Sequence, residues 1–357
     1  MRTDHDRSPS PTDASSTTAP QQVPSTPREL LVGGRWRAAD SRARMAVVNP
    51  ATEQTLAEVA DAGPEDARAA AEGLAQAQPH WARTSARERS EILYRAFSLM
   101  VERTDELALL MTLEMGKPLA EARGEVAYAA EFFRWFAEEA VRIDGSFGDR
   151  PDGTARSLVM KQPVGPSLLI TPWNFPLAMG SRKLGPALAA GCTALLKPAP
   201  QTPLSSLALA QILIEAGLPP QTLAVLPTSR AEAVVPELMS SGVFRKLSFT
   251  GSTEVGKLLL AQASANVMRT SMELGGNAPF IVLDDADLDV AVEAAFQAKM
   301  RNMGEACTAA NRIFVHRSVA EPFAAGLANR LGGLTVGDGT QPGVDVGPLI
   351  DAASRDK

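Results

Sequence analysis

Residues 165–200 read GPSLLITPWNFPLAMGSRKLGPALAAGCTALLKPAP, and this stretch decides the fold. It contains two short apolar runs, at 167–171 and 193–197, with a segment of helical pattern at 181–190 between them. Apolar strands that alternate with helices of about a dozen residues predict βαβ units and a parallel sheet. The stretch therefore predicts an α/β protein with a Rossmann-type parallel sheet.

The alternation continues on both sides of this stretch. Toward the C-terminus we expect strands at 222–226, 245–249, 279–283 and 312–316, and helices at 203–216, 231–240, 253–263, 288–301 and 320–331. Toward the N-terminus we expect a strand, a turn and a strand at 30–36, helices at 64–78, from 85, from 104 and at 120–142, a break at 144–154 and an exposed strand at 156–161. A second α/β unit is expected to begin near Gly275.

The composition argues against several classes of protein. The net charge of −6, with scattered Lys and Arg, gives no electrostatic support for nucleic-acid binding. No apolar run approaches the ~20 residues that span a bilayer, so we expect no membrane partner and a cytoplasmic location. Two cysteines and three histidines without zinc-site spacing predict no metal. Residues 1–28 are rich in Ser, Thr and Pro, which predicts a disordered tail.

Three motifs follow predicted strands, where ligands bind in parallel sheets. They are TPWNFP (171–176), LKPAP (196–200) and GSTEVG (251–256). Gly251, Ser252 and Gly256 at a helix N-terminus suit a phosphate, with a plain capped helix start as the alternative. Lys197 suits ribose hydroxyls, unless it is an ordinary solvated lysine. Asn174 suits an oxyanion, unless it makes only local backbone hydrogen bonds.

Cys307 and Glu273 suggest covalent chemistry. Cys307 lies in the segment GEACT among small and polar residues, and Glu273 lies in the segment MELGGN. A thiol nucleophile together with a carboxylate that activates water is sufficient to form and then hydrolyse a thioester. Cys192 borders an apolar strand and is expected to be buried and inert. A cofactor-independent hydrolase that pairs Cys307 with His316 is an alternative.

The ordered set of these motifs resembles the aldehyde dehydrogenase family, and within it the succinate-semialdehyde dehydrogenases, over about residues 29–357. The resemblance implies oxidation of an aldehyde to its acid with NADP or NAD as hydride acceptor. It implies Cys307 as nucleophile, Asn174 as oxyanion donor and Glu273 as the base for the deacylating water. It places at the cofactor Thr171, Trp173, Lys197, Pro200, Gly251, Ser252 and Gly256.

Two arginines bear on the substrate that the resemblance implies. In succinate-semialdehyde dehydrogenases, arginines at the motif positions of Arg182 and Arg301 bind the distal carboxylate of the substrate, which a guanidinium fork suits. Ion pairs on a helix surface are the alternative role. The acid that often follows the ribose-binding lysine by three residues is Pro200 here, which predicts that NADP is accepted. We therefore expect a small aldehyde with a distal carboxylate, with another small aldehyde as the alternative.

One residue next to the nucleophile departs from the family pattern. Glu305 stands where the family usually has Gln, two residues before Cys307. A negative charge there would disfavour the thiolate by like-charge repulsion, so Glu305→Gln is expected to speed alkylation of Cys307.

The resemblance also implies a division of the chain. It assigns 29–145 and 164–274 to the NAD(P)-binding domain, 146–163 to an oligomerisation hairpin and 275–357 to part of the catalytic domain. Family members continue past the position of Lys357, so the chain is expected to be C-terminally truncated. A homo-oligomer is implied for full-length members but not for this shorter chain. A non-catalytic NAD(P)-binding remnant is the alternative function.

Overall fold

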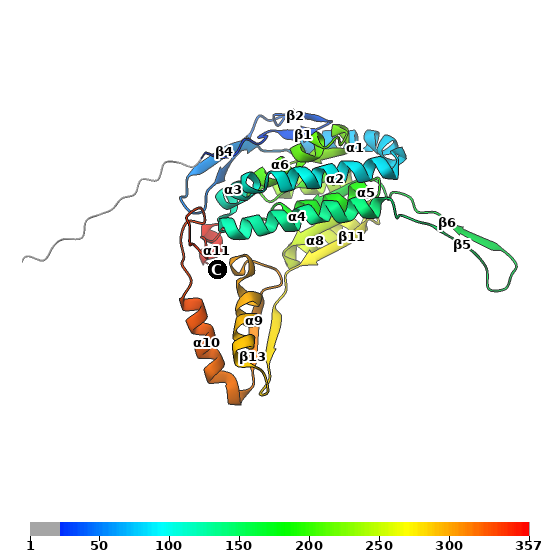
Figure 1. The fold of residues 1–357 in the computed structure, drawn as a ribbon. Coiled ribbons are helices and arrows are strands. Elements are labelled where there is room, and N and C mark those ends of the chain that lie inside the picture. Colours follow the sequence, from blue (N-terminus) through cyan, green and yellow to red (C-terminus); the bar gives the residue numbers. More distant parts are fainter. Residues whose placement is uncertain (1–21, 357) are drawn as a thin grey trace, which may run out of the picture.

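The computed structural model describes residues 22–356, and its centre is a seven-stranded sheet (Figure 1). The strand order is β11–β10–β7–β8–β9–β1–β2, in which the first five strands are parallel and the last two form an antiparallel edge. The Rossmann-type parallel sheet is thus confirmed. The strands are β1 Leu30–Val32, β2 Arg35–Arg37, β7 Ser167–Ile170, β8 Ala194–Lys197, β9 Leu223–Val225, β10 Lys246–Gly251 and β11 Arg269–Leu274.

Helices cover both faces of the sheet, because neighbouring residues of a strand face opposite sides. Leu169 and Leu196 join one apolar core, whereas Leu168 and Ile170 join another. The first core includes residues of α2 Ala86–Glu102, α3 Thr104–Met115, α4 Leu119–Ala140, α5 Ala178–Ala189 and α6 Pro203–Glu215. The second includes residues of α1 Pro64–Arg83, α7 Ala231–Ser240 and α8 Thr253–Ser264.

A second, smaller α/β unit follows the main sheet. Its strands β12 Ala278–Val282 and β13 Ala310–Val315 are parallel, and α9 Leu288–Met300 and α10 Ala320–Gly332 pack on them. Its core is small, with Val282, Ala295 and Phe323 as the buried apolar residues. The chain then returns to the first unit, where the short helix α11 Ala352–Asp356 lies (Figure 1).

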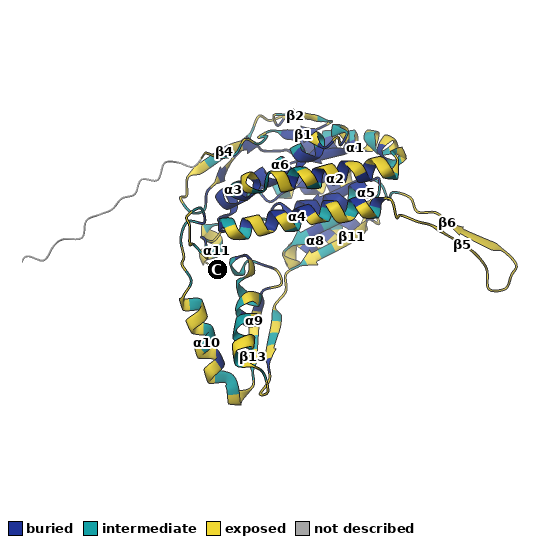
Figure 2. Ribbon diagram, viewed as in Figure 1, coloured by how far each residue is buried: buried dark blue, intermediate teal, exposed yellow. Residues whose placement is uncertain are grey.

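Some strands were not expected from the sequence. A hairpin of β3 Arg44–Val48 and β4 Thr55–Ala60 was missed, because β3 has only two buried apolar positions between exposed residues. The edge strand β11 was missed because most of its side chains are exposed. The predicted break at 144–154 is partly wrong, since β5 Ser146–Asp149 pairs there with β6 Arg156–Val159. This β5–β6 hairpin stands away from the body, with every strand residue exposed (Figure 2).

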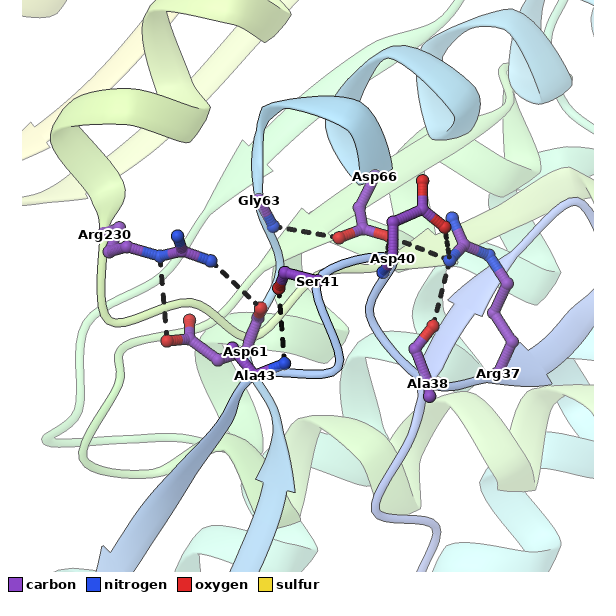
Figure 3. A network of polar contacts seen from close by, with 9 residues as sticks. All are labelled: Arg37, Ala38, Asp40, Ser41, Ala43, Asp61, Gly63, Asp66 and Arg230. Carbon is purple, nitrogen blue, oxygen red and sulfur yellow. Dashed lines mark hydrogen bonds and ion pairs between the residues drawn. The ribbon is translucent and has the colours of Figure 1, made fainter.

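Polar contacts fix the start of α1 and α7 (Figure 3). Asp66 accepts the Gly63 N–H at 2.9 Å and forms an ion pair with Arg37 at 2.8 Å. Asp61, just after β4, forms an ion pair with Arg230, just before α7, at 3.8 Å. These contacts join the β2 edge, the β3–β4 hairpin and the helices on one face of the sheet.

The disordered tail predicted at 1–28 lies mostly outside the described residues, and residues 22–28 have no regular secondary structure. Among the helices of the described part, none is both long and apolar enough to cross a membrane.

Candidate active site

The predicted ligand-binding motifs meet at the carboxyl edge of the parallel strands. Lys197 is the last residue of β8, and its carbonyl oxygen accepts the N–H of Thr171, just after β7, at 3.1 Å. On the other side of β7, Gly251 at the end of β10 is in register with Leu274 of β11, one residue after Glu273. The chain connections change direction at β7, which has β8 on one side and β10 on the other. Ligands bind at such a switch point in α/β sheets.

Lys197 is a buried cation, so the solvated-lysine alternative is wrong. Its side chain is only 5% exposed, and burial lowers the pKa of its ammonium group to about 8. The hydroxyl oxygens of Thr171 and Thr250, at the ends of neighbouring strands, are buried without a hydrogen-bond partner. Unpaired buried polar groups are rare in proteins. Their chemistry fits the ribose hydroxyls and phosphates of a dinucleotide.

Trp173 and Pro200 occupy different parts of this edge. Trp173 is half-buried in the loop that follows β7. Pro200 lines a cavity of about 710 Å³ together with residues of β3 and α11. Pro200 itself brings no charge to this cavity.

The GSTEVG segment begins α8 as a capped helix. Ser252 Oγ accepts the Val255 N–H at 3.3 Å. A Cβ on Gly256 would lie 2.5 Å from Leu274 Cδ2, so this glycine allows α8 to pack closely against β11. The capped-helix alternative thus accounts for the side-chain contact of Ser252 and for the close packing at Gly256. The N-terminus of α8 still lies at the carboxyl edge, where its N–H groups suit a phosphate.

Cys307 lies on a strained loop at the surface. It is exposed, whereas Cys192 is buried, at 2% exposure, as expected. Cys307 follows the short 3-10 turn η2 (Arg301–Gly304), in which Asn302 and Met303 have φ angles of 54° and 60°. A left-handed backbone costs roughly 1–2 kcal/mol for each residue other than glycine. The surrounding structure therefore has to hold this turn.

Asn174 contacts the loop directly. Its Nδ2 donates to the Glu305 carbonyl oxygen at 2.6 Å, and its own carbonyl oxygen accepts the Asn302 Nδ2 at 2.9 Å. The carboxamide thus lies against the backbone two residues before Cys307, where an oxyanion donor is needed. The amide nitrogen carries two N–H groups, and the contact with Glu305 uses one of them.

Sequence reasoning missed three buried charged side chains between residues 114 and 125. Lys117 is 0% exposed, and its Nζ donates to the carbonyl oxygen of Asn174 and to the side chain of Asn302. Glu125 and Glu114 are also buried, and Glu114 accepts two backbone N–H groups at the start of α6. Burial raises the pKa of Glu114 to about 7. The available signal was a set of charged residues among Leu, Met and Ala in 112–126, which does not by itself reveal burial.

Glu273 lies on the exposed edge strand and faces α5. Its Oε1 is 3.9 Å from Arg182 Nη2, and the two side chains are 58% and 44% exposed. Three residues later, Gly276 lies close to the backbone of the nucleophile. A Cβ on Gly276 would be 3.7 Å from the Cys307 carbonyl oxygen. The carboxylate of Glu273 is therefore open to water, and the chain that follows it runs close to the Cys307 backbone.

The two candidate substrate arginines form cation–π contacts with aromatic rings. Arg301 lies 5.8 Å from the ring centre of Tyr128 and 5.7 Å from that of Phe175. Arg182 lies 5.9 Å from the ring centre of Phe132. Tyr128 and Phe132, one turn apart on α4, are 4.8 Å apart. Within residues 22–356, Arg301 forms no ion pair, so its guanidinium group is the better placed for a substrate carboxylate.

The Cys–His hydrolase alternative is wrong. Cys307 precedes β13 and His316 follows it, and the six residues of this strand span about 20 Å. His316 Nδ1 lies 2.8 Å from Ser318 Oγ in a local turn. The thiol and the imidazole are therefore at opposite ends of a strand.

Glu305 gives the nucleophile a pH-dependent neighbour. Burial raises the pKa of its carboxyl group to about 7, against the opposing effect of Lys117. Below this pH Glu305 is neutral, so Glu305→Gln should leave the alkylation rate of Cys307 almost unchanged. Above it the ionised wild-type carboxylate repels the thiolate, so the variant should react faster, by roughly fivefold. Iodoacetamide labelling across this pH range measures the ratio of the two rates, and a ratio independent of pH would contradict the expectation.

Comparison with known proteins adds to this geometry. The family model described as "Aldehyde dehydrogenase family" matches residues 36–357. The chain belongs to the aldehyde dehydrogenase family. Within the part that the structure describes, this aldehyde dehydrogenase has no group of three or more His, Cys, Asp or Glu side chains arranged to hold a metal ion.

Individual aldehyde dehydrogenases are similar over most of the chain. It is 59% identical over 301 residues to succinate-semialdehyde dehydrogenase of Paenarthrobacter nicotinovorans, covering 84% of this chain and 67% of the relative. It is 50% identical over 324 residues to the NADP(+) succinate-semialdehyde dehydrogenase of Escherichia coli strain K12, covering 91% and 67%. The solved succinate-semialdehyde dehydrogenase from Burkholderia pseudomallei matches with a TM-score of 0.91 at 48% identity, covering 93% and 68%. The chain thus spans about two thirds of the length of these aldehyde dehydrogenases.

Proposed function

We propose that this aldehyde dehydrogenase oxidises a short aldehyde with a distal carboxylate, of the succinate semialdehyde class, with NADP or NAD as hydride acceptor. The observation that carries the proposal is the exposed Cys307, on a loop that Asn174 holds, that begins six residues earlier at Arg301 and that contacts the segment after Glu273. The names of the two similar relatives support the substrate class, and one of them supports NADP.

The first half of the proposed reaction oxidises the aldehyde. The Cys307 thiolate attacks the aldehyde carbon and forms a thiohemiacetal, whose oxyanion accepts hydrogen bonds from Asn174 and the backbone. NADP or NAD, held by Lys197, Thr171 and Thr250, would supply the hydride acceptor for this carbon, and Cys307 would then carry the thioester. Arg301 fixes the far end of the substrate through its carboxylate, which orients the aldehyde carbon toward the thiol.

The second half releases the acid. Glu273 takes a proton from a water molecule, and the resulting hydroxide attacks the thioester carbon. The carbon–sulfur bond breaks, so the carboxylic acid leaves and Cys307 regains its thiolate. The exposure of Glu273 supports this role, since the water has to reach the carboxylate from solvent.

The cofactor residues of this chain favour acceptance of NADP. Lys197, Thr171 and Thr250 would hold ribose hydroxyls and phosphates at the carboxyl edge. Pro200 replaces the carboxylate that would repel a 2′-phosphate. We expect the ratio of kcat/KM values for NADP and NAD to be at least one, and a ratio that strongly favours NAD would contradict this.

A direct assay tests the proposed function. The purified chain is mixed with succinate semialdehyde and either NADP or NAD, and the reduced cofactor is followed by absorbance. Turnover that depends on the aldehyde supports the proposal. Cofactor binding without turnover of any short aldehyde would instead favour the NAD(P)-binding remnant.

Arg301→Gln tests the substrate class separately. Loss of a charge-assisted contact of roughly 2–3 kcal/mol should raise the KM for succinate semialdehyde by about 30- to 150-fold. The KM for an uncharged aldehyde such as butanal should change little, because it offers no carboxylate. The same substitution at Arg317, which lies on the surface beyond β13, is the matched control. Equal changes for both aldehydes would contradict a carboxylate-binding role of Arg301.

The division of the chain and its assembly also stay proposals. The β5–β6 hairpin within 146–163 exposes Phe147, Leu158 and Met160, which supports a role in contact with another copy. Residues 275–357 form the part that carries the nucleophile, whereas 29–145 and 164–274 form the part that would bind the cofactor. A cytoplasmic location stays a prediction from the sequence.

A further inference from the structure

Lys117 is a fully buried cation with all its hydrogen bonds satisfied. Its Nζ donates to Glu125 Oε2 at 2.5 Å, to the Asn174 carbonyl oxygen at 2.8 Å and to Asn302 Oδ1 at 2.5 Å. An ammonium group has three N–H donors, so these three acceptors use all of them. The ring centre of Phe175 lies 4.6 Å away, on the same loop as Asn174. A single cation thus joins α4, the loop after β7 and the loop that carries the nucleophile.

Two rigid contacts hold Lys117 in its place. Glu125 Oε1 accepts the N–H groups of Leu177 and Ala178 at 2.9 and 3.0 Å, so its carboxylate is fixed to the start of α5. The preceding residue, Gly116, has φ of 95°, and a Cβ there would lie 3.0 Å from both Pro50 and Pro348. The turn that presents Lys117 therefore has little room to move.

The Asn302 end of the network closes into a ring around the loop. Glu305 N–H donates to the Asn302 carbonyl oxygen at 3.0 Å, and the Glu305 carbonyl oxygen accepts Asn174 Nδ2. Asn302 Nδ2 returns to the Asn174 carbonyl oxygen. The residues of this ring are Asn302 and Glu305, which precede Cys307 by five and two residues, and the oxyanion donor Asn174. Among the described residues 22–356, Lys117 is the one charged side chain with hydrogen bonds to both Asn174 and Asn302.

We propose that Lys117 is a positioning residue for the thiol chemistry, because its ammonium group locks Asn302 and Asn174 together and so fixes the Cys307 loop. This inference rests on the proposed function for its catalytic consequence, but not for its structural one. Because Lys117 is 0% exposed, its ammonium group would not reach a bound substrate or cofactor. It acts through Asn302, whose left-handed backbone has no other charged side chain in hydrogen-bond contact within residues 22–356.

Asn302→Gly is the most direct test. Glycine keeps the left-handed backbone available but removes the amide that Lys117 binds, so the variant should fold while its loop loses the lock. A misplacement of about 1 Å at a reacting group can cost about 100-fold in rate, so kcat should fall by roughly 10- to 100-fold while KM changes little. Alkylation of Cys307 by iodoacetamide should slow about tenfold, because the ordered donors around the thiolate are lost.

A second variant removes the cation without leaving a buried unpaired charge. Lys117→Met combined with Glu125→Gln is compared with the wild type, since the double substitution removes both charges of the buried pair at once. The double variant should show the slower alkylation and lower kcat. Glu114→Gln is the matched control, because Glu114 is an equally buried helix-capping glutamate that does not contact the loop.

Thiol labelling separates this inference from the proposed function. The labelling reaction needs neither aldehyde nor cofactor. Its rate therefore reports on the surroundings of the Cys307 thiol even if the protein turns over no aldehyde. Slower labelling in Asn302→Gly and in the double variant, with normal labelling in Glu114→Gln, supports the lock. If both variants lower the melting temperature but label at the wild-type rate, Lys117 is a structural residue only and the inference is overturned.

Discussion

Replacing Cys307 by alanine should abolish aldehyde-dependent reduction of NADP or NAD, with a loss of at least about 10³-fold in kcat. The reason is that no thiohemiacetal forms without the thiol, so there is no tetrahedral carbon from which a hydride leaves. Loss of a covalent nucleophile typically removes most of the catalytic acceleration of an enzyme. The measurement is the initial rate of reduced-cofactor formation with succinate semialdehyde, for the wild type and the variant.

The second cysteine supplies the control for this experiment. Cys192 is buried two residues before β8, and Cys192→Ala should keep most of the turnover, apart from a modest loss of stability. Cofactor binding should survive in Cys307→Ala, because the residues at the carboxyl edge are untouched. Equal loss of turnover in both alanine variants would mean that the assay reports folding rather than the nucleophile.

Replacing Glu273 by glutamine should block the release of the acid while sparing its formation. Hydride transfer precedes hydrolysis, so the variant should produce a burst of about one reduced cofactor per Cys307 and then turn over roughly 10²- to 10³-fold more slowly. Rapid mixing followed by absorbance measures the burst and the slow phase. Mass spectrometry of the quenched protein should show the acyl group on Cys307.

The pair with Arg182 makes a control necessary for the Glu273 variant. Glutamine removes the charge that faces Arg182 at 3.9 Å, but an exposed pair contributes little to stability. Glu58→Gln, on the exposed side of β4, is the matched substitution and should leave both phases unchanged. If Glu273→Gln abolishes the burst as well, Glu273 acts before hydride transfer and the assignment as deacylating base is wrong.

The sequence was sufficient for the main sheet apart from its edge strand β11, and for the position of the edge where ligands bind. Apolar runs such as 167–171 are buried on both faces, and the motifs that follow them had to meet where parallel strands end. The edge strand β11 escaped prediction because its stability comes from pairing with β10 rather than from an apolar pattern. Burial and pairing of strands far apart in the sequence cannot be read from a local pattern.

The sequence predicted the reacting residues of the candidate site but not the buried residues that support them. Cys307 and Asn174 lie in recognisable motifs. In the structure, Asn174 contacts the backbone of Glu305, two residues before Cys307. Lys117 and Asn302 were missed, because lysine and asparagine side chains are mostly exposed and both residues lie outside the predicted helices. Their burial depends on tertiary contacts that join residues 185 positions apart. Local reasoning therefore found the reacting groups but not the groups that hold them.

The separation of Lys117 from Asn302 has a consequence for how the protein folds. Contacts between residues so distant in the chain form late, since a long loop has to close before they contribute any stability. The Met303 sulfur adds a further link, as it accepts the N–H of Gly347 at 2.9 Å. During synthesis, the thiol would thus acquire its final surroundings only after the last third of this chain has emerged and docked. Partly folded molecules would carry a thiol without its ordered neighbours, which makes Cys307 reactivity a reporter of completed folding.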